Sequence, residues 1–254
     1  MPAVGMDGAM LHEVISPRRA VLAERIPGPW RAPLLRLALA IALLLALFAG
    51  EWAAMALLWW DSSTYNHILL VPLIVGWLVW QRAPLVARLA PQGWWPGLVP
   101  LAGALLVWLL GDVSGLATAA HLGAVAMLPA TVLLLGVRVA LGLLFPLAYL
   151  LFLVPIGDEL VPPLQMITAV ITIALTEASG IPAVIDGVFI DTPVGLFEVA
   201  EACSGVKFLV AMVALGTLVA HQCFRSWQRR LAFMAAAVVL PIVANGVRAW
   251  GTIW

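Results

Sequence analysis

A cysteine with charged neighbours stands where a polar segment turns into a long apolar run. Glu201 precedes Cys203, and Ser204 and Lys207 follow it. The thiolate is the nucleophilic form of cysteine, and a helix N-terminus and a nearby cation both stabilise it. The apolar run that begins at Gly205 predicts such a helix and Lys207 supplies the cation, whereas Glu201 opposes ionisation. The balance favours a reactive thiol; the alternative is that Cys203 is a small packing residue at a helix end.

An arginine near the end of the next apolar run is the second candidate. Cys203 lies 18 residues before His221. Arg248 lies 18 residues after Arg230, and each interval corresponds to roughly 27 Å of helix. Two antiparallel helices of that length bring Cys203 and Arg248 to the same depth. An arginine at membrane depth needs protein or water around it and marks a candidate site, whereas an interfacial arginine that snorkels is the alternative.

The composition indicates the kind of scaffold that must position these two residues. The 254 residues are 64% hydrophobic and 10% charged, whereas soluble domains have about 25% charged residues. The apolar runs are long enough to cross a bilayer, which takes roughly 20 residues per helix. The sequence therefore predicts an all-α polytopic membrane protein in contact with the lipid bilayer. Its formal net charge is zero, which argues against a nucleic-acid partner.

The chain divides into a polar N-terminal tail, residues 1–33, and a multi-spanning membrane domain, residues 34–254. The first apolar run continues to spanning length without a cleavage site, so we expect a retained helix rather than a secretory signal. About seven transmembrane helices are predicted, at 37–60, 63–80, 94–110, 116–137, 139–156, 205–220 and 231–254.

Basic residues predict the orientation. Eleven of the 13 Lys and Arg residues fall in the tail or in alternate loops, which the positive-inside rule assigns to the cytoplasm. The two exceptions are Lys207 and Arg248. The N-terminus is therefore predicted to be cytoplasmic, with Cys203 on the outer side of the membrane. Cys223 falls on the opposite side, so the two cysteines are not expected to form a disulfide.

The segment 157–202 begins and ends on the outer side, and we expect it not to cross the membrane. Two prolines followed by residues 164–178 predict a re-entrant or interfacial helix, in which Thr168, Thr172 and Thr176 form a mildly polar stripe. Residues 184–199, with an Asp186-Gly187 turn, predict short strands. The segment is thus an extracytoplasmic helix and a small β-like cap that lead into Cys203.

Two motifs carry a resemblance to a known family. The stretch Glu201-Ala-Cys-Ser-Gly205 followed by Pro241-Ile-Val-Ala-Asn245-Gly-Val-Arg248 resembles the exosortases, most closely the A-type exosortases. These are bacterial inner-membrane cysteine peptidases or transpeptidases that process the C-terminal PEP-CTERM sorting tails of exported proteins. The likeness covers roughly residues 50–254 and includes Tyr65-Asn-His67, Val154-Pro-Ile-Gly-Asp-Glu159 and Gly180-Ile-Pro182.

The resemblance implies a reaction and assigns roles to residues. Cys203 would be the nucleophile that forms a thioester, and Arg248 would stabilise the thiolate or the oxyanion. It implies supporting or substrate-binding roles for Glu201, Ser204, Lys207, Asn245 and His67. The family's third site residue is a histidine on a following segment, which these residues do not include, so the resemblance predicts a C-terminally truncated chain.

Several alternatives stay open. A non-enzymatic polytopic protein, such as a transporter or an assembly factor in polysaccharide export, would also fit the composition. The resemblance implies no cofactor and no metal, although His67 and His121 share a leaflet and an absorbance spectrum would test haem binding. Ser204 is interpreted as a helix cap, and Arg248 is a candidate partner for Glu51. The substrate, the acceptor that resolves the thioester and the oligomeric state are not predicted.

Overall fold

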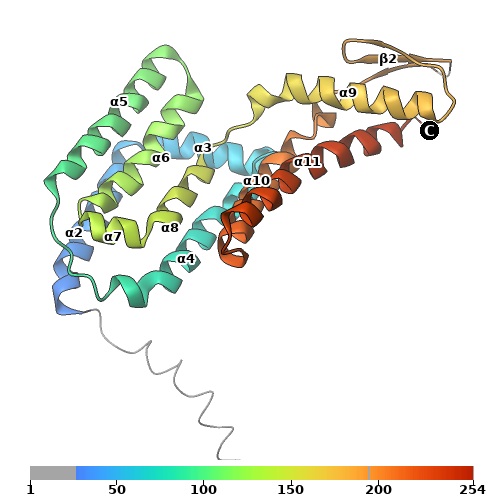
Figure 1. Ribbon diagram of the computed structural model, residues 1–254. Helices are drawn as coiled ribbons and strands as arrows, with labels where there is room; N and C mark the ends of the chain where they lie inside the picture. The colour runs from blue at the N-terminus through green and yellow to red at the C-terminus, as the bar shows by residue number, and fades with distance from the viewer. Residues whose placement is uncertain (1–26, 194, 254) are drawn as a thin grey trace, which may run out of the picture.

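The computed structural model describes residues 27–193 and 195–253. Its long elements are helices, with a small sheet late in the chain (Figure 1). The α-helices are α2 (Gly28–Leu47), α3 (Ala49–Asp61), α4 (Val71–Val86), α5 (Leu98–Ser114), α6 (Ala117–Leu133), α7 (Val137–Gly142), α8 (Leu144–Tyr149), α9 (Val161–Ala178), α10 (Val206–Cys223) and α11 (Trp227–Trp250).

Six helical ranges in the described residues are long and apolar enough to cross a membrane, which confirms the predicted fold class. They are Gly28–Leu47, Asn66–Val86, Trp95–Ser114, Asp158–Ala178, Val206–Cys223 and Trp227–Trp250. Ala117–Leu133 and Leu144–Leu153 are shorter apolar helices. Proline occupies one of the first two positions of α2, α4 and α9, where its missing N–H costs no helical hydrogen bond.

Two predicted spans are interrupted in the structure. The first helix begins at Gly28, so residues 28–33 of the predicted tail are already helical, and it breaks at Phe48 between α2 and α3. The span predicted at 139–156 is divided into α7, α8 and a 3-10 helix at Leu150–Leu153. The break at Leu143 lies between Gly142 and Pro146, residues that interrupt helices, and the prediction missed it because it followed the apolar run alone.

The predicted helix and cap after residue 157 are present. Helix α9 is followed by the antiparallel strands β1 (Val184–Asp186), β2 (Phe189–Thr192) and β3 (Gly195–Glu198), in the order β1-β2-β3. The Gly187 backbone has φ of 61° in the β1–β2 turn, which favours glycine. By length and composition Asp158–Ala178 is also a candidate span, so its re-entrant or interfacial placement remains a prediction.

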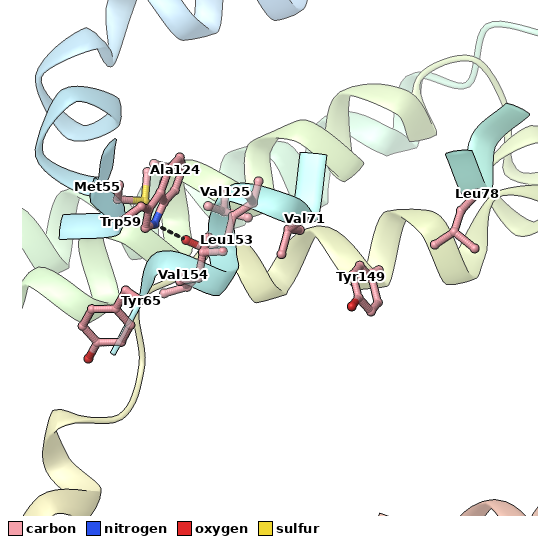
Figure 2. Close-up of a cluster of buried hydrophobic side chains, with 11 residues drawn as sticks. Met55, Trp59, Tyr65, Val71, Leu78, Ala124, Val125, Tyr149, Leu153 and Val154 are labelled. Carbon is pink, nitrogen blue, oxygen red and sulfur yellow. Dashed lines mark hydrogen bonds between the residues drawn. The ribbon is translucent and has the colours of Figure 1, made fainter. Parts of the chain in front are cut away.

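A buried apolar cluster holds α3, α4, α6 and α8 together. Met55 is fully buried and belongs to one cluster with Tyr65, Val125 and Leu153 (Figure 2). The indole N–H of Trp59 donates to the carbonyl oxygen of Leu153 at 3.1 Å, drawn as the dashed line in Figure 2. Leu218 of α10 packs against this cluster, so it also contacts the later part of the chain.

The molecule has two regions that we name by residues. The N-terminal region is 28–153, and the C-terminal region is 158–253, where α9 and α11 lie side by side with the sheet beyond the end of α9 (Figure 1). Tyr65 donates to Asp158 at 2.7 Å and Tyr149 donates to the carbonyl oxygen of Ala214 at 3.1 Å, so hydrogen bonds join the two regions.

Candidate active site

Cys203 ends a short 3-10 helix, Glu201–Cys203, that leads from the sheet to α10. Its side chain is half-buried and packs against a cluster of Ala169, Ile190 and Val199. Helix α9 and the cap therefore cover one side of the thiol. Gly205 forms the N-cap of α10, so the thiol lies just before the positive end of a long helix, as the sequence predicts.

Asn245 connects three elements at this point. Its side-chain Nδ2 donates to the carbonyl oxygen of Cys203 at 2.6 Å and to Oγ1 of Thr168 at 3.0 Å. Asn245 and Thr168 are both almost fully buried, where a hydrogen bond is strong and an unmade one is costly. One amide thus fixes the backbone of Cys203 against both α9 and α11.

Gly205 allows this close approach. Its backbone has φ of 81°, the left-handed region that suits glycine, and a Cβ built there would lie 2.8 Å from Cγ of Asn245. Any other residue would strain the backbone and push Asn245 away. The glycine of the cysteine motif therefore has a geometric role that its sequence position alone did not reveal.

Arg248 reaches the same network from one turn further along α11. Its Nη2 donates to Oδ1 of Asn245 at 3.0 Å, and its guanidinium lies 5.8 Å from the ring centroid of Phe208. The ammonium of Lys207 lies 5.3 Å from the same centroid. Two cations therefore gather over one exposed aromatic ring beside the Cys203 segment. Arg248 is exposed and Lys207 half-buried.

The threonine stripe of α9 faces protein. Thr168, Thr172 and Thr176 are each at most 1% exposed. The hydroxyls of Thr172 and Thr176 donate to backbone carbonyls one turn back, at 2.7 and 2.8 Å. Because these hydroxyl groups find hydrogen-bond acceptors within α9, helix α11 can pack directly on them. The stripe is thus the contact face for α11, and Thr168 is a site neighbour that was noted only as part of that stripe.

The other residues expected at the site are placed differently. Glu201 is exposed. Ser204 is buried, but it does not cap α10, because Gly205 takes that position and the Ser204 hydroxyl accepts from Val206 N–H at 3.5 Å, a long contact. His67 lies in the 3-10 helix before α4, where its Nδ1 lies 3.1 Å from the Thr64 carbonyl oxygen.

Glu51 has a different partner from the one expected. Its carboxylate lies 3.7 Å from Nε2 of His121 and accepts a hydrogen bond from the indole N–H of Trp108 at 3.3 Å. The suggested Glu51–Arg248 pair is therefore wrong, because α3 packs on the α5–α6 hairpin while Arg248 lies in the C-terminal region. His221 stacks on Phe145 with the ring centroids 3.5 Å apart.

The described part of the chain gives no group of three or more His, Cys, Asp or Glu side chains arranged for a metal ion. Cys203 and Cys223 are both free thiols; Cys203 lies just before α10 and Cys223 is its last residue, so they stand at opposite ends of that helix. His67 and His121 have separate partners on different elements. The chemistry that the Cys203 segment offers is therefore that of one thiol whose backbone carbonyl is held by Asn245, with Arg248 bound to the same amide and Lys207 in the first turn of α10.

A thiol, an arginine and a lysine at one helix end are suited to acyl transfer. A thiolate attacks carbonyl carbon, and cations nearby stabilise the negative oxygen that develops. The same groups would suit any electrophilic carbonyl. Geometry alone therefore indicates a class of reaction and leaves the substrate open.

Comparison with known proteins supplies the family. No curated protein and no solved structure matches the chain. A sequence model of the transmembrane exosortase family matches residues 59–254, which include the Cys203 and Arg248 motifs and more than three quarters of the chain. The chain is therefore a multi-pass membrane protein that belongs to the transmembrane exosortase family.

Proposed function

We propose that this protein is a membrane-embedded cysteine peptidase or transpeptidase that cleaves the C-terminal PEP-CTERM-type sorting tails of exported proteins. Cys203 is the nucleophile, and the reaction proceeds through a thioester on its sulfur. Membership of the exosortase family supports the proposal. The activity serves surface export, with an exported protein as the substrate.

The observation that carries the proposal is the position of Asn245. Its amide joins the Cys203 carbonyl to Arg248, with bonds of 2.6 and 3.0 Å. A structural cysteine at a helix end needs no such connection to an arginine. A nucleophile needs it, because catalysis requires the thiol and the charge-stabilising group to keep one relative geometry.

The proposed reaction has two steps. The Cys203 thiol gives up its proton to water and the thiolate attacks the scissile carbonyl carbon; the resulting oxyanion collapses to a thioester as the C–N bond breaks and the leaving amine takes a proton from water. Water or an acceptor amine then attacks the thioester, which releases the processed protein and restores the thiol. Arg248 and Lys207 stabilise the negative oxygen in both steps, and Arg248 does so with a planar guanidinium that can donate two hydrogen bonds.

The proposed location is the bacterial inner membrane, with the N-terminus in the cytoplasm and Cys203 facing the periplasm. Three exposed arginines support it under the positive-inside rule: Arg82 near the end of α4, Arg88 just after it and Arg138 in α7. A membrane-impermeant maleimide tests it in intact cells with a permeable outer membrane. Cys203 should be labelled and Cys223 should be protected; the reverse pattern would invert the topology.

The function is tested by expressing the full chain with an exported reporter that ends in a PEP-CTERM-type tail. We expect tail removal with the natural chain and with Cys223→Ala, and none with Cys203→Ala. Hydroxylamine should release the reporter from Cys203 as a hydroxamate, since it cleaves thioesters. Processing that survives Cys203→Ala contradicts the proposal, as does failure of the natural chain to form an adduct; the latter outcome favours a transporter or assembly factor.

A further inference from the structure

An apolar groove lies between α5, α6, α7 and α8, away from the Cys203 segment. Its volume is about 580 Å³, and every side chain that lines it is proline, alanine, valine or leucine. Ligand pockets commonly enclose about 300–1,000 Å³. Leu141 and Leu144, which line the groove, are each 60% exposed. The groove is therefore an open, apolar site on the outside of the helix bundle.

The groove has two structural causes: a break in the helical segment on one side, and small side chains on the helices on the other side. The chain breaks at Leu143 between α7 and α8, so no continuous helix fills the space beside α6. The facing positions on α5 and α6 include Ala104, Ala126 and Ala130. The small side chains on one wall and the helix break on the other leave the groove unfilled by the protein's own side chains.

The length of the groove matches one leaflet of a bilayer. Along α6 its lining runs from Leu122 to Leu133, which is roughly 16 Å of helix. Half of a hydrocarbon core about 30 Å thick is roughly 15 Å. A transmembrane helix of a partner would need the whole thickness, so the dimensions favour a single acyl chain.

An exposed arginine and an exposed tryptophan stand at one end of the groove. The loop after α4 is tied to the turn after α6, since the backbone N–H of Gln92 donates to the carbonyl oxygen of Leu135 at 3.0 Å. This bond brings Trp95, 78% exposed, to the same end as exposed Arg138. Arg138 follows the groove-lining Val137 and makes no ion pair with a carboxylate in the described residues.

We propose that this groove binds a membrane phospholipid, with one acyl chain along α6 and the phosphate group on Arg138. The apolar lining accounts for the chain, and the cation accounts for the anionic phosphate. Trp95 is exposed at the same end, and tryptophan is enriched at membrane interfaces. The site is independent of the thiol and of the peptidase proposal.

Photolabelling tests the acyl position in the full chain. A phosphatidylglycerol that carries a diazirine in one acyl chain is reconstituted with the protein in vesicles and irradiated. We expect labelled peptides to concentrate in 122–133 and 137–151. Labelling that is equal on the exposed faces of α2 and α11 would overturn the proposal, because it would reveal bulk lipid only.

Substitutions test the same site by native mass spectrometry of the protein with phosphatidylglycerol. Ala126→Trp fills the groove and should abolish the retained lipid, whereas Ala102→Trp, on an exposed face of α5 outside the lining, should keep it. Equal retention in both variants contradicts the acyl site. The photolabelling of the natural chain still decides the matter if Ala126→Trp fails to fold.

The headgroup position has its own matched pair. Arg138→Gln should weaken phosphatidylglycerol retention about fivefold, while Arg88→Gln, exposed at the same end outside the lining, should change it little. Equal weakening contradicts the phosphate assignment.

A disulfide-linked dimer formed through Leu144→Cys would overturn the proposal in favour of a second copy of the chain in the groove. Cross-linking of that cysteine to a peptide would overturn it in favour of a protein partner.

Discussion

The contacts around Cys203 in the C-terminal region differ in kind from the closest helix contact of the N-terminal region. In the C-terminal region Asn245 makes directional hydrogen bonds to Cys203, Thr168 and Arg248. In the N-terminal region the α5–α6 hairpin packs backbone against backbone, with Gly123 directly against Trp108. We infer that close packing is sufficient to hold two scaffold helices together. A reactive group also needs hydrogen bonds that fix its orientation.

The largest expected effect is at Gly205. Gly205→Ala should destabilise the protein by about 2–5 kcal/mol, because left-handed backbone costs an L-residue about 1–2 kcal/mol and overpacking adds about 1–3. Gly180→Ala is the control, since Gly180 has a φ of 84° with nothing within 4 Å of a built Cβ. Unfolding in detergent measures both variants; an equal loss of stability would show that the contact with Asn245 is unimportant.

The matching change in the N-terminal region is Gly123→Ala. A Cβ there overlaps the backbone of Trp108, so the two helices must separate, at a cost of about 3 kcal/mol. Gly103→Ala on α5 meets nothing within 4 Å and should be neutral or stabilising, because alanine favours helix more than glycine. The rate of maleimide labelling at Cys203 should stay the same in both variants. A changed labelling rate at Cys203 would show that packing in the N-terminal region also controls the geometry around the thiol.

Asn245→Ala should have a smaller effect on stability and a distinct effect on the thiol. Loss of the bonds to Cys203 and Thr168 is expected to cost about 1–3 kcal/mol, and the loosened turn should let Cys203 react faster with maleimide. Gln165→Ala removes a bond of 2.9 Å to the Val199 carbonyl oxygen, further back on the same segment. It should leave the labelling rate unchanged, and equal rates in the two variants would argue against positioning by Asn245.

The smallest effect is expected at Tyr65, which joins the regions. Tyr65→Phe removes the bond to exposed Asp158 and should cost about 1 kcal/mol. Burial, and then Asp158, raise the pKa of the Tyr65 hydroxyl above its ordinary value. The protonated form is thus favoured on folding, so this contribution is present below about pH 10, the pKa in the unfolded chain, and is lost as pH rises above it.

The melting temperatures of the natural chain and of Tyr65→Phe measure that dependence. Their difference should be constant at neutral and mildly alkaline pH and should shrink above about pH 10. A difference that grows in that range would show that Tyr65 is ionised in the folded protein.

Much of the fold could be predicted because it depends on apolar runs and turn residues. The equal spacings of 18 residues predicted that Cys203 and Arg248 lie at one depth. The hydrogen bonds that Asn245 makes to both residues agree with that prediction. The break at Leu143 was missed because the prediction followed the apolar run, although Gly142 and Pro146 beside the break are residues that interrupt helices. Glu51 could not be assigned to His121, because a charge inside a bundle can pair with any helix that happens to be its neighbour.

The bond between Asn245 and Cys203 spans 42 residues of chain, and this has a consequence for biosynthesis. Helix α10 and the turn after it are made before α11, so the thiol leaves the ribosome without the amide that fixes it. At about 5–20 residues per second, the interval is about 2–8 s. Until then the Cys203 turn lacks the bond to Asn245, and its surroundings are completed only when α11 has been inserted beside α9.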